Sequence, residues 1–387
     1  MTNRLLIWWG VFLIVLSGEY LLLAPEAGAK DSVKRQVPAI TSSGLRKAAG
    51  GNPGVVEIIS DPLGETEFRV ADEIASAVAS TQETGPNGEI ALRVIPVVSR
   101  GGIQAVRDVL TLPNADFGIV SAQILDRLRE TRELGDIKDR IAYVAPLYVE
   151  EIHLLAGPNV RSLADLQGQA VSIGEDEGTT QVIARELLSS ADVQVRAERW
   201  GLKESIAALK AGKIAAAFLV SGKPVDDLKT LTTSDDLRLI PVTLSSPPSG
   251  FLPSTITAED YPALLRPGEK VNTFGVQNIL FAYNWPSQSQ RAQLEEMFIK
   301  SLVLRLAALK RPPHHPKWQE VEPARTLPGW QRLVSMDTWL KQLEKRLRAE
   351  FDQFITETNP NLNTADREFL FQNYLRRTET PSTTGSR

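Results

Sequence analysis

Four turns rich in glycine, serine and threonine each follow a predicted strand and open a predicted helix. They are residues 60–66 (SDPLGET), 99–104 (SRGGIQ), 120–123 (VSAQ) and 174–180 (GEDEGTT). In an open α/β sheet, small ligands bind beyond the carboxyl ends of the strands, where helix N-terminal amides and hydroxyl groups point into a crevice. For any single turn, helix capping by serine or threonine explains the composition equally well. The presence of four such turns favours a common ligand site.

The fourth turn contains three consecutive acidic residues, Glu175, Asp176 and Glu177. It lacks the lysine that a nucleotide-binding P-loop places against phosphates, and its acidic residues do not have the ligand spacing of an EF-hand. We therefore expect neither a P-loop nor a calcium loop of that kind.

Catalytic and metal-ligating residues are not evident. The chain has no cysteine and three histidines, of which we interpret His153 as a satisfied strand residue and His314 and His315 as exposed loop residues. No Gly-x-Ser-x-Gly elbow of a serine hydrolase is present. The sequence predicts no catalytic residue, no metal site, no cofactor and hence no enzyme.

The elements that carry these turns alternate between strand and helix. Runs at 55–60, 92–99 and 115–121 have strand character, and those at 68–80, 103–110 and 122–130 have helical spacing. Later, strand-like runs at 170–174 and 215–222 alternate with helical segments in the same manner, and residues 237–244 close this part of the chain. Such alternation predicts an α/β fold with a mainly parallel sheet and helices on its faces.

Two long extended runs interrupt the alternation, at residues 141–157 and 271–284. We interpret them as crossings between two α/β lobes joined by a hinge. Lobe 1 then comprises residues 55–148 and 271–310, and lobe 2 comprises residues 149–270. The four turns would face a cleft between the lobes.

The remaining segments lie at the ends of the chain. Residues 1–29 have the layout of a secretory signal peptide or an uncleaved N-terminal anchor, and residues 30–54 read as a linker. Residues 311–376 predict a helical extension, with tryptophans as packing anchors, and residues 377–387 a disordered tail. The formal net charge of −4 gives no reason to expect nucleic acid as a partner.

Three segments resemble, in order and spacing, the TAXI-type solute receptors of TRAP transporters. They are ADFGIVSAQIL, the run from Tyr143 to Leu188 that includes SLADLQGQAVSIG and TTQVIARELL, and GKIAAAFLVSGKP. The resemblance covers approximately residues 55–309. It implies a periplasmic-binding-protein type II fold and a periplasmic receptor that delivers an organic acid or amino acid to the membrane subunits of a transporter.

The resemblance also implies a set of ligand-binding residues. The implied set is Ser60, Gly64, Thr66, Ser99, Arg100, Gly101, Gly102, Ser121, Gln123, Glu177, Gly178, Thr179, Thr180 and Ser221. Backbone amides at Gly101, Gly102, Gly178 and Thr179 would serve as donors, and Arg100 would pair either with a ligand carboxylate or with Glu177.

Two departures from the family pattern add negative charge. The first turn carries Asp61 and Glu65, and the fourth carries Glu175, Asp176 and Glu177, where the family has mostly neutral small residues. These changes favour a zwitterionic or cationic solute, or an internal pairing with Arg100. A different class of function stays open: a membrane-tethered periplasmic sensor or scaffold with a receptor-like fold, which an uncleaved N-terminus and the C-terminal helices would favour.

Overall fold

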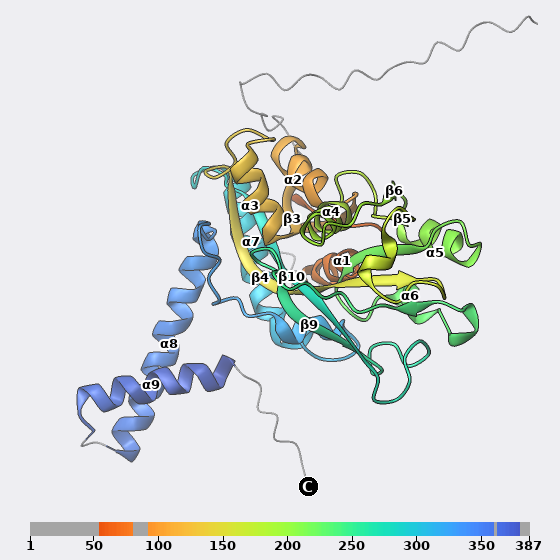
Figure 1. Cartoon of the computed structure of the whole chain (residues 1–387). Helices are drawn as coiled ribbons and strands as arrows, with labels where there is room; N and C mark the ends of the chain where they lie inside the picture. The colour runs from red at the N-terminus through yellow and green to blue at the C-terminus, as the bar shows by residue number, and fades with distance from the viewer. Residues whose placement is uncertain (1–53, 80–91, 360–361, 380–387) are drawn as a thin grey trace, which may run out of the picture. The chain divides into compact units, whose positions relative to one another are not determined.

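The computed structural model describes residues 54–79, 92–359 and 362–379 (Figure 1). The predicted signal or anchor segment, the linker up to residue 53 and the chain after Glu379 lie outside these described residues. Within the described residues, no helix has the length and apolar character needed to cross a membrane.

The first part of the central sheet, here called the first sheet region, has three parallel strands in the order β2-β1-β3. Each strand leads into a helix through one of the turns predicted to bind ligand. The strands are β1 (Val55–Ser60), β2 (Arg93–Val98) and β3 (Ala115–Ser121), and the helices are α1 (Thr66–Ala79), α2 (Gly102–Thr111) and α3 (Ala122–Thr131).

The second sheet region repeats this style in the order β7-β5-β6, again with parallel pairing. Its strands are β5 (Ala170–Ser172), β6 (Arg196–Glu198) and β7 (Ala216–Ser221), and its helices are α4 (Thr179–Ser190), α5 (Leu202–Lys210) and α6 (Asp226–Lys229). Two single-turn helices, η1 (Leu163–Leu166) and η2 (Thr233–Asp235), lie in its connections.

Two long antiparallel strands, β4 (Ile141–Ala156) and β10 (Lys270–Tyr283), join the regions at the centre of the sheet (Figure 1). β10 pairs with β3, β4 pairs with β7, and the short strands β8 (Arg238–Leu239) and β9 (Leu252–Thr257) pair with β4 and β10. The predicted α/β class with a central sheet and two crossing runs is confirmed. The expectation of a mainly parallel sheet is wrong, because β4 and β10 pair antiparallel with each other and with β3, β7, β8 and β9.

Hydrophobic side chains cover the sheet in both regions, which explains why the strands read as continuous apolar runs. In the first region, all seven residues of β3 are buried, with Phe117 and Ile119 in one apolar cluster and Val120 in another. Two further clusters form in the second region, around Val220 and Leu219. The division of the chain into two lobes at the predicted boundaries stays a prediction.

The C-terminal part begins with α7 (Gln290–Leu309) and continues through η3 (Pro316–Glu320), α8 (Val334–Thr358) and α9 (Thr364–Glu379). Trp318 is fully buried in the apolar cluster that α1 and α7 share, which fits its predicted role as a packing anchor. α9 continues to Glu379, so residues 377–379 are helical, and the disordered tail stays a prediction.

Candidate ligand-binding site

The β1–α1 turn of the first sheet region contacts the carboxyl end of β7 in the second. The Thr66 amide donates to Ser221 Oγ at 3.1 Å, and the Thr66 hydroxyl donates to the carbonyl oxygen of Gly222. The Ser221 hydroxyl in turn donates to Glu67 Oε2 at 3.2 Å. Residues predicted from distant parts of the sequence are therefore brought together here.

The β2–α2 turn makes a second direct contact, with the β5–α4 turn. The Gly102 amide donates to Thr179 Oγ1 at 3.1 Å, and the Ile103 amide donates to the carbonyl oxygen of Glu177 at 2.8 Å. Gly102 has φ +54°, and a Cβ there would lie 2.5 Å from that carbonyl oxygen, so only glycine permits this approach. We call these two sets of contacts the seam between the sheet regions.

Most of the hydrogen-bonding groups predicted to hold a ligand bind other groups of the chain, either across the seam or within their own region. The Gly101 amide donates to Ser99 Oγ at 2.9 Å, and the Gly178 amide donates to the carbonyl oxygen of Glu175 at 3.1 Å. The Ser60 hydroxyl donates to the carbonyl oxygen of Val97, and Thr180 Oγ1 accepts from the Val220 amide. Gly64 lies against the side chain of Asp227. The Ser121 hydroxyl is buried and, among the described residues, has no hydrogen-bond partner.

The acidic residues of the β5–α4 turn are held mainly by arginines. Arg107 of α2 forms a bidentate ion pair with Glu177, with Nη2 2.9 Å from Oε1, and this hydrogen bonding holds the pKa of Glu177 below its usual range. Arg199 Nη1 lies 3.1 Å from Asp176 Oδ2. Of the two partners considered for Arg100, a ligand carboxylate and Glu177, Glu177 is instead paired with Arg107. Arg100 Nη1 donates to the backbone oxygen of Asp176 at 3.5 Å.

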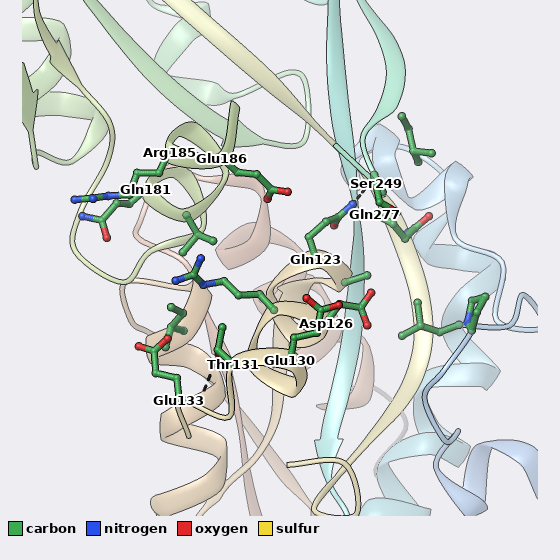
Figure 2. A pocket seen from close by; sticks show the side chains of 18 of the residues that line it. Gln123, Asp126, Glu130, Thr131, Glu133, Gln181, Arg185, Glu186, Ser249 and Gln277 are labelled. Atoms are coloured by element: carbon green, nitrogen blue, oxygen red, sulfur yellow. Dashed lines mark hydrogen bonds between the residues drawn. The ribbon is translucent and has the colours of Figure 1, made fainter. Parts of the chain in front are cut away.

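A groove of about 1120 Å³ opens beside the seam, between α3 of the first sheet region and α4 of the second (Figure 2). The residues that line it include Pro146 of β4 and Gln277 of β10. Of the predicted ligand-binding residues, Gln123 and Glu177 line it, and Gln123 Oε1 is buried with no hydrogen-bond partner among the described residues. The groove thus offers the free volume that the seam lacks.

Charged side chains of both signs line this groove, several of which Figure 2 labels. Burial raises the pKa of Glu186 on α4. Two residues of α3 also act on it: the charge of Arg127 opposes the rise, and the charge of Glu130 adds to it. Charges on the two walls of the groove therefore interact across it. The carboxylates are Asp126, Glu130, Glu133, Glu177 and Glu186, and the guanidinium groups are those of Arg127, Arg185 and Arg325.

Sequence reasoning missed part of a carboxylate cluster at the seam. Burial raises the pKa of Asp61 to about 7, although a hydrogen bond with Thr179 opposes the shift. Burial also raises the pKa values of Glu65 and Glu150 well above their usual range, and neighbouring carboxylates add to both shifts. Asp61 and Glu65 were visible as departures from the family pattern. Glu67 and Glu150 carried no such signal, because one lies within a helix pattern and the other within an apolar strand.

Two of the three histidines, His153 and His315, are buried. His153 is buried in β4, with Nδ1 3.0 Å from the Glu151 carbonyl oxygen and Nε2 2.8 Å from the Tyr261 hydroxyl, which confirms a satisfied strand histidine. The expectation of an exposed loop is wrong for His315, which is buried and whose amide donates to the carboxylate of Glu73. Burial lowers the pKa of both His153 and His315 to about 4.

Comparisons with known proteins place this geometry in context. A family model described as the NMT1-like family matches residues 60–295, more than half of the chain. Among solved structures, arginine-binding protein from T. maritima is 13% identical over 67% of this chain and 92% of its own, with a TM-score of 0.38.

Two further solved structures have similar scores. An amino acid ABC transporter substrate-binding protein from Streptococcus pneumoniae, bound to L-arginine, is 13% identical over 69% of this chain and 91% of its own, with a TM-score of 0.41. The alkanesulfonate-binding protein SsuA from Xanthomonas axonopodis pv. citri, bound to MOPS, is 13% identical over 79% and 94%, with a TM-score of 0.41.

Proposed function

The chain belongs to the NMT1-like family, and from that premise we propose that it is a solute-binding protein that captures a small organic acid or amino-acid-like solute between its two sheet regions. It acts by binding and not by catalysis. The type II periplasmic-binding-protein fold and the TAXI-type resemblance support this proposal, since both belong to receptors that close around a solute.

One observation carries the proposal: the groove between α3 and α4 is built from both sheet regions and presents guanidinium groups and carboxylates together. Arginine binds a ligand carboxylate through paired hydrogen bonds, and a carboxylate binds an ammonium group. A groove with both favours a solute that carries both charges. The volume of about 1120 Å³ is at the upper end of small-molecule sites, so closure of the regions would tighten it.

The TAXI-type resemblance also suggests where the bound solute would be delivered. A TAXI-type receptor in the periplasm, exported by the N-terminal segment, would deliver the solute to the membrane subunits of a TRAP-type transporter. Mapping the N-terminus of the mature protein tests the export step, because a chain that begins near Lys30 diffuses freely and one that keeps Met1 is tethered.

A second candidate function rests on the C-terminal segment that includes η3. Here the His315 amide binds Glu73 of α1 at 3.0 Å, while His315 Nε2 lies 3.2 Å from the Pro224 carbonyl oxygen beyond β7. The segment therefore bonds to both sheet regions and would oppose their separation. A receptor fold held closed in this way fits a membrane-tethered sensor or scaffold.

A thermal-shift screen of the protein against amino acids, carboxylates and polyamines tests the binding function. A solute at about 100 times its dissociation constant should add roughly 2.7 kcal/mol to the free energy of unfolding. Replacing Arg185 of the groove with alanine should weaken that stabilisation, while Arg238→Ala, an exposed arginine on β8 away from the groove, should leave it unchanged. An absence of any stabilising solute would favour the sensor or scaffold.

A further inference from the structure

Three carboxylates converge in the β1–α1 turn, away from the groove. One oxygen each from Asp61, Glu65 and Glu67 lie within 4.8 Å of one another. Asp61 and Glu67 are 2% and 1% exposed, so water screens their charges little. None of the three forms an ion pair with any lysine, arginine or histidine that the structure describes.

Several buried carboxylate oxygens in and near this cluster have no hydrogen-bond partner among the described residues. Asp61 Oδ1 and Glu67 Oε1 are buried and accept no hydrogen bond from the described residues. Glu150, on a different element, is 0% exposed; its Oε1 accepts from Asn278 Nδ2 at 2.7 Å, and its Oε2 has no partner among the described residues. The charges of Asp61 and Glu65 help to raise the pKa of Glu150, so its carboxylate lies close enough to interact with the cluster. Buried carboxylate oxygens without partners are costly unless a cation or proton joins them.

The other charged groups nearby do not supply that cation. Glu175 and Asp227 of the second sheet region add negative charge, since both raise the pKa of Glu65. Lys317 Nζ lies 2.8 Å from Glu151 and 2.8 Å from Glu320, so its charge is already shared by two carboxylates. Arg100 lies near Asp61 and Glu65 in the lining of a small cavity, but its Nη1 donates to the Asp176 carbonyl oxygen.

A small cavity adjoins the cluster. It has a volume of about 20 Å³ and is lined by residues that include Asp61, Glu65, Glu175 and Trp200. Such a volume is enough for one water molecule or one monatomic ion. The potential ligands are all oxygen atoms, which suit hard divalent cations and not zinc or copper. Ca²⁺ accepts irregular sets of carboxylate oxygens with bonds of about 2.3–2.6 Å, whereas Mg²⁺ demands near-octahedral geometry and usually keeps several waters, so a site built from several protein carboxylates favours Ca²⁺.

We propose that the β1–α1 turn binds one Ca²⁺ ion through Asp61, Glu65 and Glu67. This metal site goes beyond solute binding in the groove and does not depend on it. Its ligands are also bonded across the seam, because Glu67 accepts from Ser221 and Asp61 bonds to Thr179. Bound Ca²⁺ would therefore favour the contact between the two sheet regions.

Terbium luminescence tests the site directly, because Tb³⁺ replaces Ca²⁺ and is sensitised by a nearby tryptophan, here Trp200. We expect EDTA-treated protein to give saturable Tb³⁺ emission at one ion per chain, which Ca²⁺ displaces at lower concentration than Mg²⁺. Asp61→Asn and Glu67→Gln should each weaken Ca²⁺ binding by at least tenfold. Asp72→Asn, on the exposed face of α1, is the matched control and should bind as the unmodified protein does.

Specific results would overturn the metal site. Emission that does not saturate, or that is equal in the Asp61→Asn and Asp72→Asn variants, contradicts it. Stabilisation by putrescine but not by Ca²⁺, lost in Asp61→Asn, would instead assign the cluster to an organic cation. If a variant does not fold, displacement of Tb³⁺ by Ca²⁺ in the unmodified protein still decides the question. Amino acid binding without Ca²⁺ binding refutes only the metal site, and the reverse result refutes only the proposed function.

Discussion

Arg107 of α2 and Glu177 of the β5–α4 turn form a bidentate ion pair across the seam, with Nη2 2.9 Å from Oε1. Glu177 adopts φ +66°, a left-handed conformation that is uncommon for a residue with a side chain. The ion pair thus fixes a strained turn of the second sheet region against a helix of the first. It links the acidic turn, which sequence analysis singles out, to a partner that sequence analysis does not identify.

Loss of this ion pair should weaken the protein modestly. Both side chains are partly exposed, so we expect Arg107→Met to lower the free energy of unfolding by about 1 kcal/mol at pH 7, as urea denaturation would measure. The pKa of Glu177 is lowered in the folded state, so its contribution is present above the pKa of the unfolded chain. The loss should shrink as pH falls through the lowered pKa. Arg196→Met, an exposed arginine on β6, should have no effect, and an equal effect would argue against the pair.

The close approach of the two turns at Gly102 makes a sharper prediction. Alanine at Gly102 would place Cβ 2.5 Å from the Glu177 carbonyl oxygen, so Gly102→Ala should separate the turns. Hydrogen exchange at the Ile103 amide, which donates to that oxygen, should accelerate by at least tenfold. Gly168→Ala controls for the left-handed backbone alone, because Gly168 has φ +71° and nothing lies within 4 Å of its Cβ position. Unchanged protection of Ile103 would contradict the seam.

The ion pair between Lys317 and Glu151 should contribute much more to stability. Their side chains are 3% and 2% exposed, with Nζ 2.8 Å from Oε1. Lys317→Met leaves a buried carboxylate without its cation, and we expect a loss of about 3–5 kcal/mol in urea denaturation. Lys300→Met removes an exposed pair with Glu296 and should cost less than about 1 kcal/mol. Similar losses in the two variants would show that the C-terminal segment is not anchored to β4 as described.

His153 should make the protein less stable in acid. Burial lowers its pKa from 6.5 to about 4, so between these values the unfolded chain binds more protons than the folded chain. The stabilising contribution is therefore complete above pH 6.5 and is lost as pH falls toward 4, by roughly 2 kcal/mol between pH 7.5 and 5. His153→Gln should reduce this dependence in thermal or urea unfolding across that range. His314→Gln should keep the full dependence, and an unchanged slope in His153→Gln would contradict this assignment.

Much of the architecture could be predicted from local patterns. The apolar runs of β1 and β3 and the helical spacing of α2 and α3 identify these elements directly, and the long runs of β4 and β10 mark the crossings. The direction of pairing was not accessible in the same way. Whether β10 runs parallel or antiparallel to β3 depends on where the chain returns, and local composition does not encode that.

The site was predicted only in part, for a similar reason. Turn composition singles out Thr66, Gly102 and Thr179, and the family resemblance adds Ser221. Neither tells whether their hydrogen-bonding groups bind a ligand or one another. Ion-pair partners far apart in sequence, such as Arg107 and Glu177, become evident only when the helices are placed. Glu150 lies among apolar residues of β4, so no local signal distinguishes it as part of a polar cluster.

Isothermal titration with the solute that gives the largest thermal shift measures solute binding itself. We expect saturable binding with one solute per chain, weakened at least tenfold by Arg185→Ala in the groove and unchanged by Arg238→Ala outside it. Equal affinity in both variants would place the solute elsewhere. An absence of binding heat for every amino acid, carboxylate and polyamine would contradict the proposed function itself.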